Sequence, residues 1–111
     1  MANVEQCELA LHGLAATLAA KDPATRTKGF DRTLTCSVRD LDVIFAGRLH
    51  DGLLVDIART ADPKAQIRLS LSSDDLLSMV DGSLNFAAAW AKGHIKVGAG
   101  VRDMIKLRTI F

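Results

Sequence analysis

The sequence contains few aromatic residues. It has no Tyr, one Trp and four Phe in 111 residues, although 49% of its residues are hydrophobic. Aliphatic side chains, mainly those of Ala, Leu, Val and Ile, must therefore fill most of the core. Such side chains fill space efficiently, and they can also line a smooth apolar cavity. A chain of this size buries roughly two-thirds of the surface that it exposes when unfolded, so we expect a single domain over residues 1–111.

The sequence also has few cysteines and a small net charge. Cys7 and Cys36 lie far apart and there is no Cys-x-x-Cys motif, so neither a disulfide framework nor a zinc knuckle is indicated. Cys36 occupies an apolar strand position, where a buried free thiol is the commonest outcome. The formal net charge of +1 argues against nucleic-acid binding driven by overall charge.

Long apolar runs are missing as well. No segment approaches the length of a transmembrane span, and no basic region precedes an apolar one at the N-terminus. We therefore expect a soluble, cytoplasmic protein.

Residues that could support catalysis or bind a metal do not form a recognisable site. His12, His50 and His94 are isolated and lack ligand spacing. Asp74 and Asp75 would point about 100° apart on a helix, where they complement the helix dipole and do not form a facing acid–base pair. The serines lack a nucleophile elbow.

The segment Gly98-Ala99-Gly100 follows a predicted strand and precedes a predicted helix, as in a dinucleotide fingerprint. Asp103 stands where that motif needs its third Gly, and the repeated βαβ units are missing. A close backbone approach at a turn is the simpler use of these glycines. The sequence therefore predicts a protein that is not an enzyme and has no metal and no cofactor.

An amphipathic helix is predicted from about Asn3, its expected N-cap, to Ala20. Its polar side carries Glu5 and Glu8, and Lys21 is the only cation, whereas a helix that lies on a membrane favours Lys and Arg. We therefore expect this helix to pack on a sheet. Its apolar stripe consists of Val4, Cys7, Leu11, Leu14 and Leu18.

Four segments alternate apolar and polar residues, as half-buried strands do. They are Arg32–Arg39, Leu41–Leu49, Leu53–Ala58 and Ala65–Ser72. Asp51-Gly52 predicts a tight hairpin between the second and third strands, whereas Pro23–Gly29 is a polar linker. On the third strand we expect one face to carry Leu53, Val55 and Ile57. One apolar and one polar face per strand indicate an antiparallel sheet that is solvated on one side and covered by helices on the other.

Two further helices and a short strand are predicted after this sheet. Ser72 and Asp75 form a variant of the capping box, and Gly82 suits the C-terminal end of that helix. Ser83 is expected to cap a second short helix, which Gly93 closes. Residues 94–97 alternate as in a short fifth strand.

The last helix, from Gly100, is predicted to be amphipathic. Its apolar face is Val101, Met104, Ile105 and Phe111, with Leu107 beside it, and its polar side is Arg102, Asp103, Lys106 and Thr109. From Ser83 onward, cations outnumber Asp103; they are Lys92, Lys96, Arg102, Lys106 and Arg108. They form either a solvated face or a weak, salt-sensitive site for an anionic membrane surface.

These C-terminal blocks, in this order and spacing, resemble the sterol carrier protein 2 (SCP2) sterol-binding domain family. The resemblance covers roughly Arg32 to Phe111, and Ser83-Leu84-Asn85 departs from the charged or proline-containing start of that family's second helix. A second departure is that the sequence ends in Thr109-Ile110-Phe111 and not in the peroxisomal tripeptide of eukaryotic members. The resemblance is to a small stand-alone member of bacterial type. The matching positions are Asp75, Gly82, Phe86, Gly93, Ile95, Lys96, Val97 and Gly98.

The resemblance implies an α+β fold, with an approximately five-stranded, mainly antiparallel sheet and helices packed on one face. It also implies non-catalytic binding or transfer of a sterol, a fatty acyl chain or a similar lipid in a tunnel between the sheet and the C-terminal helices. By this resemblance the lining would be Phe45, Val55, Leu76, Met79, Val80, Phe86, Trp90 and Ile105. A polar mouth would draw on Lys92, Lys96 or Arg102.

An alternative function stays open. From spacing alone, Phe86 and Trp90, one turn apart, are better explained as core residues than as a ligand site. The chain would then be an accessory interaction module with a filled core and no exchangeable ligand, and an exposed apolar patch would meet a protein partner or form a homodimer.

Overall fold

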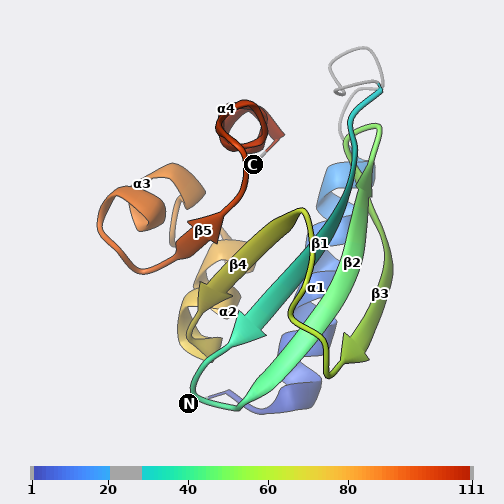
Figure 1. Cartoon of the computed structure of the whole chain (residues 1–111). Helices are drawn as coiled ribbons and strands as arrows, with labels where there is room; N and C mark the ends of the chain where they lie inside the picture. Colours follow the sequence, from blue (N-terminus) through green and yellow to red (C-terminus); the bar gives the residue numbers. More distant parts are fainter. Residues whose placement is uncertain (1, 21–28, 111) are drawn as a thin grey trace.

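A computed structural model describes residues 2–20 and 29–110, and side chains as far as residue 106. Apart from Gly29, the predicted linker Pro23–Gly29 lies outside these residues. The elements occur in the order shown in Figure 1: α1 (Val4–Ala19), β1 (Asp31–Val38), β2 (Val43–His50), β3 (Leu53–Thr60), β4 (Ile67–Leu71), α2 (Ser73–Asp81), α3 (Phe86–Ala91), β5 (Lys96–Gly98) and α4 (Val101–Ile110). Within the described part of the chain, no helix is both long enough and apolar enough to cross a membrane.

The five strands form one sheet in the order β3-β2-β1-β4-β5. Neighbouring strands are antiparallel except β1 and β4, which are parallel. The predicted α+β fold, with a mainly antiparallel sheet of about five strands and helices on one face, is confirmed. On β1, the side chains of Leu34, Cys36 and Val38 are buried beneath the helices. On β4, the predicted alternation is confirmed, because Ile67, Leu69 and Leu71 are all buried.

The connection from β3 to β4 crosses the face of the sheet opposite the helices (Figure 1). The Thr35 hydroxyl donates a hydrogen bond to the Pro63 carbonyl at 3.1 Å, and the backbone amide of Gln66 donates to Thr33 Oγ1 at 2.9 Å. Thr35 is consequently buried, although it lies on the face that was expected to be solvated. This crossing lets β4 return to the free edge of β1 in parallel orientation.

Two of the three predicted helix N-caps, Asn3 and Ser72, are confirmed. Asn3 Oδ1 accepts from the Gln6 amide at 2.8 Å, and Gln6 returns the bond to the Asn3 amide at 2.9 Å, which completes a capping box. Ser72 caps α2 by accepting from the Asp75 amide at 3.1 Å. At the other end of α2, Gly82 adopts the left-handed φ of 87° that a helix C-terminus commonly uses.

The predicted cap of α3 was wrong. Its N-cap is Asn85, whose side-chain oxygen accepts from the Ala88 amide at 3.2 Å. Ser83 instead belongs to the end of α2, since its hydroxyl donates to Asp81 at 2.6 Å and its backbone amide donates to the same carboxylate at 2.8 Å. The neighbouring carboxylate therefore determines the role of Ser83.

A buried serine connects residue 2 with the turn between β1 and β2. Ser73 is fully buried; its backbone amide and its hydroxyl both donate to the Asp40 carboxylate, at 2.8 and 2.6 Å. The Ala2 amide in turn donates to the Ser73 hydroxyl oxygen at 3.2 Å. The two hydrogen bonds from Ser73 lower the pKa of Asp40, because they stabilise its ionised form.

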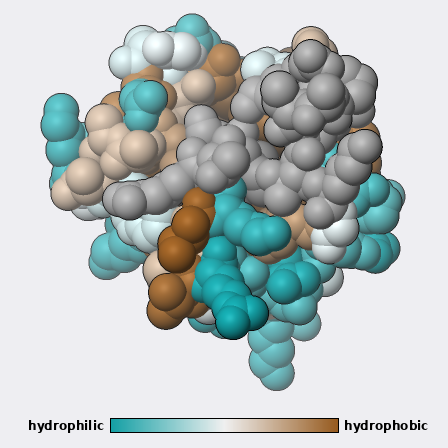
Figure 2. All heavy atoms as spheres, turned by 90° about the horizontal axis from the view of Figure 1, so that it is seen from above, coloured by the Kyte–Doolittle hydropathy of each residue, from teal (hydrophilic) through white to brown (hydrophobic). Residues whose placement is uncertain are grey.

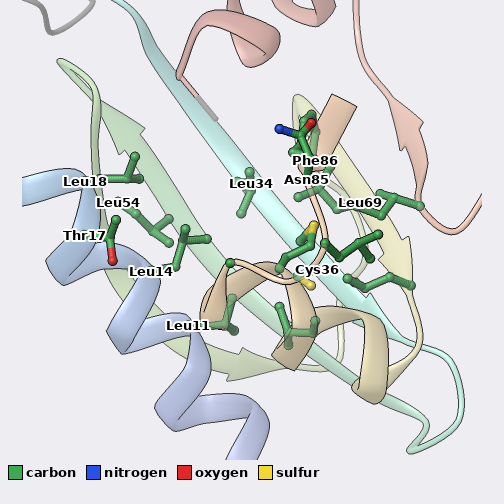
Figure 3. A pocket seen from close by; sticks show the side chains of 16 residues that line it. Leu11, Leu14, Thr17, Leu18, Leu34, Cys36, Leu54, Leu69, Asn85 and Phe86 are labelled. Atoms are coloured by element: carbon green, nitrogen blue, oxygen red, sulfur yellow. The ribbon is translucent and has the colours of Figure 1, made fainter. Parts of the chain in front are cut away.

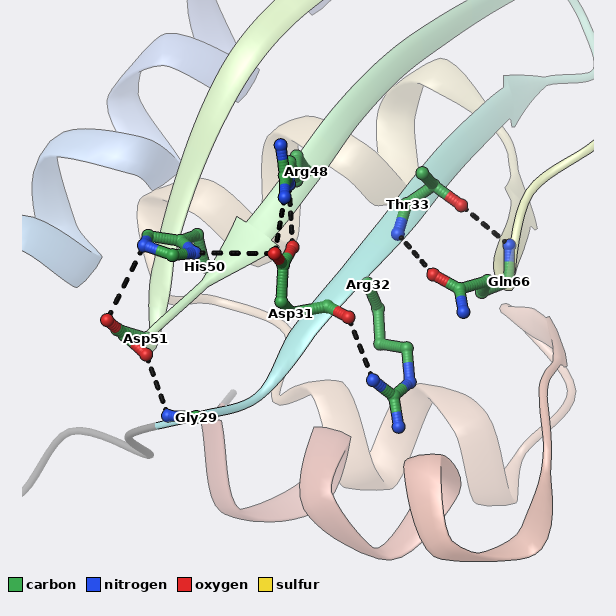
Figure 4. Close-up of polar contacts among 8 residues, drawn as sticks. All are labelled: Gly29, Asp31, Arg32, Thr33, Arg48, His50, Asp51 and Gln66. Atoms are coloured by element: carbon green, nitrogen blue, oxygen red, sulfur yellow. Dashed lines mark hydrogen bonds and ion pairs between the residues drawn. The ribbon is translucent and has the colours of Figure 1, made fainter.

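The β2–β3 hairpin has the predicted tight turn. Asp51 and Gly52 have φ values of 51° and 81°, and positive φ at both central residues is what a type I′ turn requires. Near this turn, β2 is joined to β1 by polar contacts (Figure 4): Arg48 Nε donates to Asp31 at 2.6 Å, and His50 Nδ1 lies 3.6 Å from the same carboxylate. The hydrogen bond from Arg48 lowers the pKa of Asp31.

A β-bulge interrupts β3 and overturns the predicted face of this strand. Between the pairs Ala46–Ala58 and Arg48–Val55, β3 has one residue more than β2, and Asp56 in this gap has φ 57°. A bulge of this kind changes which side chains face the core. Leu54 is therefore buried opposite Leu49, whereas Leu53 and Val55 were expected in the core and do not pack against it. Of the three predicted core residues, only Ile57 packs there.

The last helix is oriented differently from the prediction. Val101 and Ile105, expected to face inward, are 77% and 62% exposed. Asp103, expected on the polar outer side, has a side chain only 15% exposed and lies 3.1 Å from Arg32 Nε of β1. This ion pair holds the polar side of α4 toward the sheet, so the apolar side faces outward. The side chains of Leu107, Thr109 and Phe111 lie outside the described residues.

Candidate functional site

A cavity of about 320 Å³ lies between α1, the sheet and α2 (Figure 3). Helix α1 lines it with Leu11, Leu14, Thr17 and Leu18, and the sheet contributes Leu34, Cys36, Leu54, Leu69 and Leu71. The remaining wall is formed by Leu76, Met79, Gly82, Leu84, Asn85, Phe86 and Ile95. We call this cavity the central pocket.

The wall of the central pocket is almost entirely aliphatic. Among the described residues that line it there is no charged side chain. Its volume lies at the lower end of the range of roughly 300–1,000 Å³ that is usual for small-molecule sites. An apolar cavity of this size can accept an apolar ligand by removing that ligand from water.

The local sequence explains why the central pocket is open next to the bulged strand. Gly47 of β2 has no side chain, and a Cβ atom there would lie 3.2 Å from Leu54 Cδ1. The glycine therefore leaves room for Leu54, which the bulge at Asp56 turns toward the core. Leu34 of β1 pairs with Gly47 and projects into the middle of the pocket (Figure 3).

Polar groups gather where the wall is exposed. Thr17 of α1, Gly82 and Asn85 are the exposed members of the lining, so they mark the mouth. The Thr17 hydroxyl donates to the Gly13 carbonyl at 3.0 Å, so its oxygen can still accept a hydrogen bond. Asn85 accepts the Ala88 amide through its oxygen, so its NH₂ group is the part that can donate to a ligand.

The one thiol in the wall is inert. Cys36 is 2% exposed, and burial raises its pKa to about 12. Cys7, also buried and free, has its pKa raised mainly by burial. Because the thiolate is the reactive form, Cys36 acts here as a small apolar side chain, and the prediction of a buried free thiol is confirmed.

Ionisable residues elsewhere do not converge on the central pocket. The described residues contain no group of three or more His, Cys, Asp or Glu side chains that could hold a metal ion. His12, His50 and His94 are exposed, and His94 Nδ1 lies 3.6 Å from Asp75 on the surface. The cations Lys92, Lys96 and Arg102, expected at the mouth, do not line the pocket.

The structure brings three of the eight predicted ligand-binding residues to the central pocket, namely Leu76, Met79 and Phe86. The other five do not line it. Phe45 is buried in the core, whereas Val55, beyond the bulge, does not pack against the core and Ile105 is exposed. Val80 packs beside Gly13 of α1, and Trp90 packs against the ring of Phe86. Whether any of the eight contacts a ligand stays a prediction.

The residues that sequence reasoning missed come mainly from α1 and β1. Leu11, Leu14 and Leu18 were recognised as an apolar stripe and assigned to ordinary packing, as was Leu34. The one feature of the sequence that could have identified them is their composition, because a stripe made only of aliphatic residues can line a cavity. Periodicity shows which residues face inward, but it does not show whether the space they face is filled.

No protein-family model matches the chain, and no curated protein matches its sequence. Solved structures do match its fold. Sterol Carrier Protein 2 Like 2 from Aedes aegypti is 15% identical, with a TM-score of 0.67, over 96% of this chain and 97% of that one. The chain has the SCP2 fold. The resemblance inferred from the C-terminal blocks is thereby confirmed at the level of fold.

Two further structural matches concern different kinds of protein. Sterol Carrier Protein-2 from Aedes aegypti, solved in complex with the C16 fatty acid palmitate, is 19% identical, with a TM-score of 0.58, over 93% of this chain and 91% of that one. The sec-alkylsulfatase Pisa1 from Pseudomonas sp. is 22% identical, with a TM-score of 0.60, over 81% of this chain but only 14% of that enzyme. The same fold thus occurs in a small carrier and as a minor part of a large enzyme.

Proposed function

We propose that the protein binds a lipid with one long apolar chain in the central pocket, without catalysing a reaction. The observation that carries this proposal is the pocket itself, which encloses about 320 Å³ with an aliphatic wall. Each methylene group that enters contributes roughly 0.8 kcal/mol by leaving water. The palmitate complex of the SCP2 from Aedes aegypti supports this class of ligand.

The ligand would enter with its polar head at the mouth. The Asn85 NH₂ group can donate to an oxygen of the head, and the Thr17 oxygen can accept from a hydroxyl. A flexible acyl chain can follow an irregular wall by rotating about its single bonds, which the fused rings of a sterol cannot do. We therefore favour an acyl chain over a sterol. Met79, half-buried in the wall, can adjust its shape to the chain.

Trp90 should report on occupancy of the central pocket. It is the only Trp in the chain, and its ring packs edge-on against Phe86, with 5.9 Å between the ring centroids. A ligand that contacts Phe86 should move this ring, so titration with palmitate should change the Trp90 emission and reach saturation. Acetate, which has no chain to bury, serves as the control and should cause no change. Equilibrium dialysis that finds no palmitate bound to the protein would rule out the proposal.

A second candidate function is an accessory module of a larger assembly. The match to 14% of Pisa1 favours it, because it shows this fold as a small part of an enzyme. In that case the central pocket has no exchangeable ligand, and an exposed surface meets a protein partner or a second copy of the chain. A pocket that takes up no lipid, in a protein that forms a stable dimer, is the result that distinguishes this candidate.

A further inference from the structure

Helix α4 is attached to the rest of the molecule by its polar side. Asp103 lies 3.1 Å from Arg32 Nε of β1, and the Lys106 ammonium group lies 5.4 Å from the centroid of the Phe30 ring. Residues three apart on a helix share one face, so Asp103 and Lys106 together form the side that meets the body. The Arg32 guanidinium also covers the Phe30 ring, at 5.0 Å, which links the two attachments.

The opposite side of α4 is apolar and uncovered in the described chain. Val101 and Ile105, four residues apart and therefore on one face, are 77% and 62% exposed. They are two of the three large hydrophobic side chains that are exposed in the described part of the chain. Seen from above, this end of the molecule has hydrophobic and hydrophilic surface side by side (Figure 2). Exposed apolar side chains in such a setting are typical of a contact surface.

The charge beside this apolar face is positive. Arg102 and Lys106 are exposed on α4, and its sequence includes a third cation, Arg108. The single acidic residue of the helix, Asp103, is matched by Arg32 and therefore adds little negative charge to the surface. An apolar face flanked by Arg and Lys is the pattern of a helix that lies in the interface of an anionic bilayer.

We propose that α4 docks the protein on the surface of an anionic lipid bilayer. Val101 and Ile105 enter the headgroup region, and Arg102, which is exposed beside them, lies near the lipid phosphates. This contact uses a surface separate from the central pocket, so it does not depend on whether the pocket binds a lipid. It also replaces the sequence-based expectation, in which only the basic charge met the membrane and Val101 and Ile105 faced the core.

The third exposed hydrophobic residue provides a matched control. Leu9 of α1 is 71% exposed, close to the values for Val101 and Ile105. Its helix carries Glu5 and Glu8 and has no basic residue in its last turn. An anionic surface would repel this helix, so Leu9 should not contribute to bilayer binding.

The test compares the parent protein with Val101→Gln/Ile105→Gln and with Leu9→Gln. Glutamine is polar and favours helices, so these exposed positions should stay helical. Each protein is sedimented with vesicles of phosphatidylcholine alone, and with vesicles of equal parts phosphatidylcholine and phosphatidylglycerol, at low and high salt. Circular dichroism checks that all three proteins are equally folded, and analytical ultracentrifugation gives their oligomeric state.

The parent protein should bind the anionic vesicles at low salt and much less at high salt, because salt screens the cations. The double variant should lose at least about tenfold in affinity, whereas Leu9→Gln should bind like the parent. Equal binding to both kinds of vesicle, or equal losses in the two variants, would overturn the proposal. The proposal would also be overturned if the parent protein is a dimer, the double variant is a monomer and both bind vesicles equally well. In that case α4 would be a contact between two copies of the chain.

Discussion

Replacing Leu34 by Phe is expected to weaken palmitate binding by at least about tenfold and to leave the melting temperature close to that of the parent. Leu34 projects into the middle of the central pocket (Figure 3). A ring at this position would occupy space that a ligand needs. Because the pocket already has an unfilled volume of about 320 Å³, the ring should fit without displacing its neighbours. In a filled core, by contrast, added volume costs about 1–3 kcal/mol.

Val38→Phe is the matched control for this substitution. Val38 lies on the same strand and face as Leu34 and is buried, but it does not line the central pocket. The added ring has no space there, so this variant should lose stability. Calorimetric melting and palmitate titration should be carried out on both proteins. A Leu34→Phe variant that binds palmitate like the parent, or that melts as early as Val38→Phe, would show that the pocket is not an open ligand site.

Phe45→Leu is expected to have the reverse effect, with lower stability and unchanged palmitate affinity. Phe45 is 1% exposed at the centre of β2, opposite Cys36, and does not line the central pocket. Partial truncation of such a core residue costs about 1–3 kcal/mol. Urea denaturation measures this loss, since the midpoint should fall with little change in slope.

The same substitution at Phe86 completes this comparison. Phe86 is also buried, but it lines the central pocket, so Phe86→Leu should reduce palmitate affinity in addition to stability. The resemblance to the SCP2 family had assigned both rings to the ligand site, and the structure separates them. If Phe45→Leu lowers palmitate affinity as much as Phe86→Leu does, the boundary of the pocket described above is wrong.

Much of the fold was predictable because short-range chemistry determines it. The N-cap at Asn3, the Asp51-Gly52 turn and the alternation of β4 each depend on residues within a few positions of one another. The resemblance of the C-terminal blocks then provided the overall arrangement. Features determined over longer distances were missed. The orientation of α4 depends on a pair between Arg32 and Asp103, which are 71 residues apart, and no periodicity within the helix contains that information.

The site was less predictable than the fold for a related reason. Because of the bulge at Asp56, Leu54 faces the core and Val55 does not. Strict alternation along β3 predicts the reverse, with Val55 in the core. The wall contributed by α1 was assigned to packing, because an aliphatic stripe such as Leu11, Leu14 and Leu18 has the same pattern in a filled core and around a cavity. Spacing reveals the direction of a side chain, but the volume it faces depends on how closely the helices approach the sheet.

Native mass spectrometry of the delipidated protein, mixed with palmitate, tests most directly whether the central pocket holds an acyl chain. The proposal predicts a complex with one palmitate per protein chain, and this complex should be nearly lost in Leu34→Phe under the same conditions. A parent protein that stays entirely unbound, or that binds several palmitates equally well with and without the substitution at Leu34, would contradict the account.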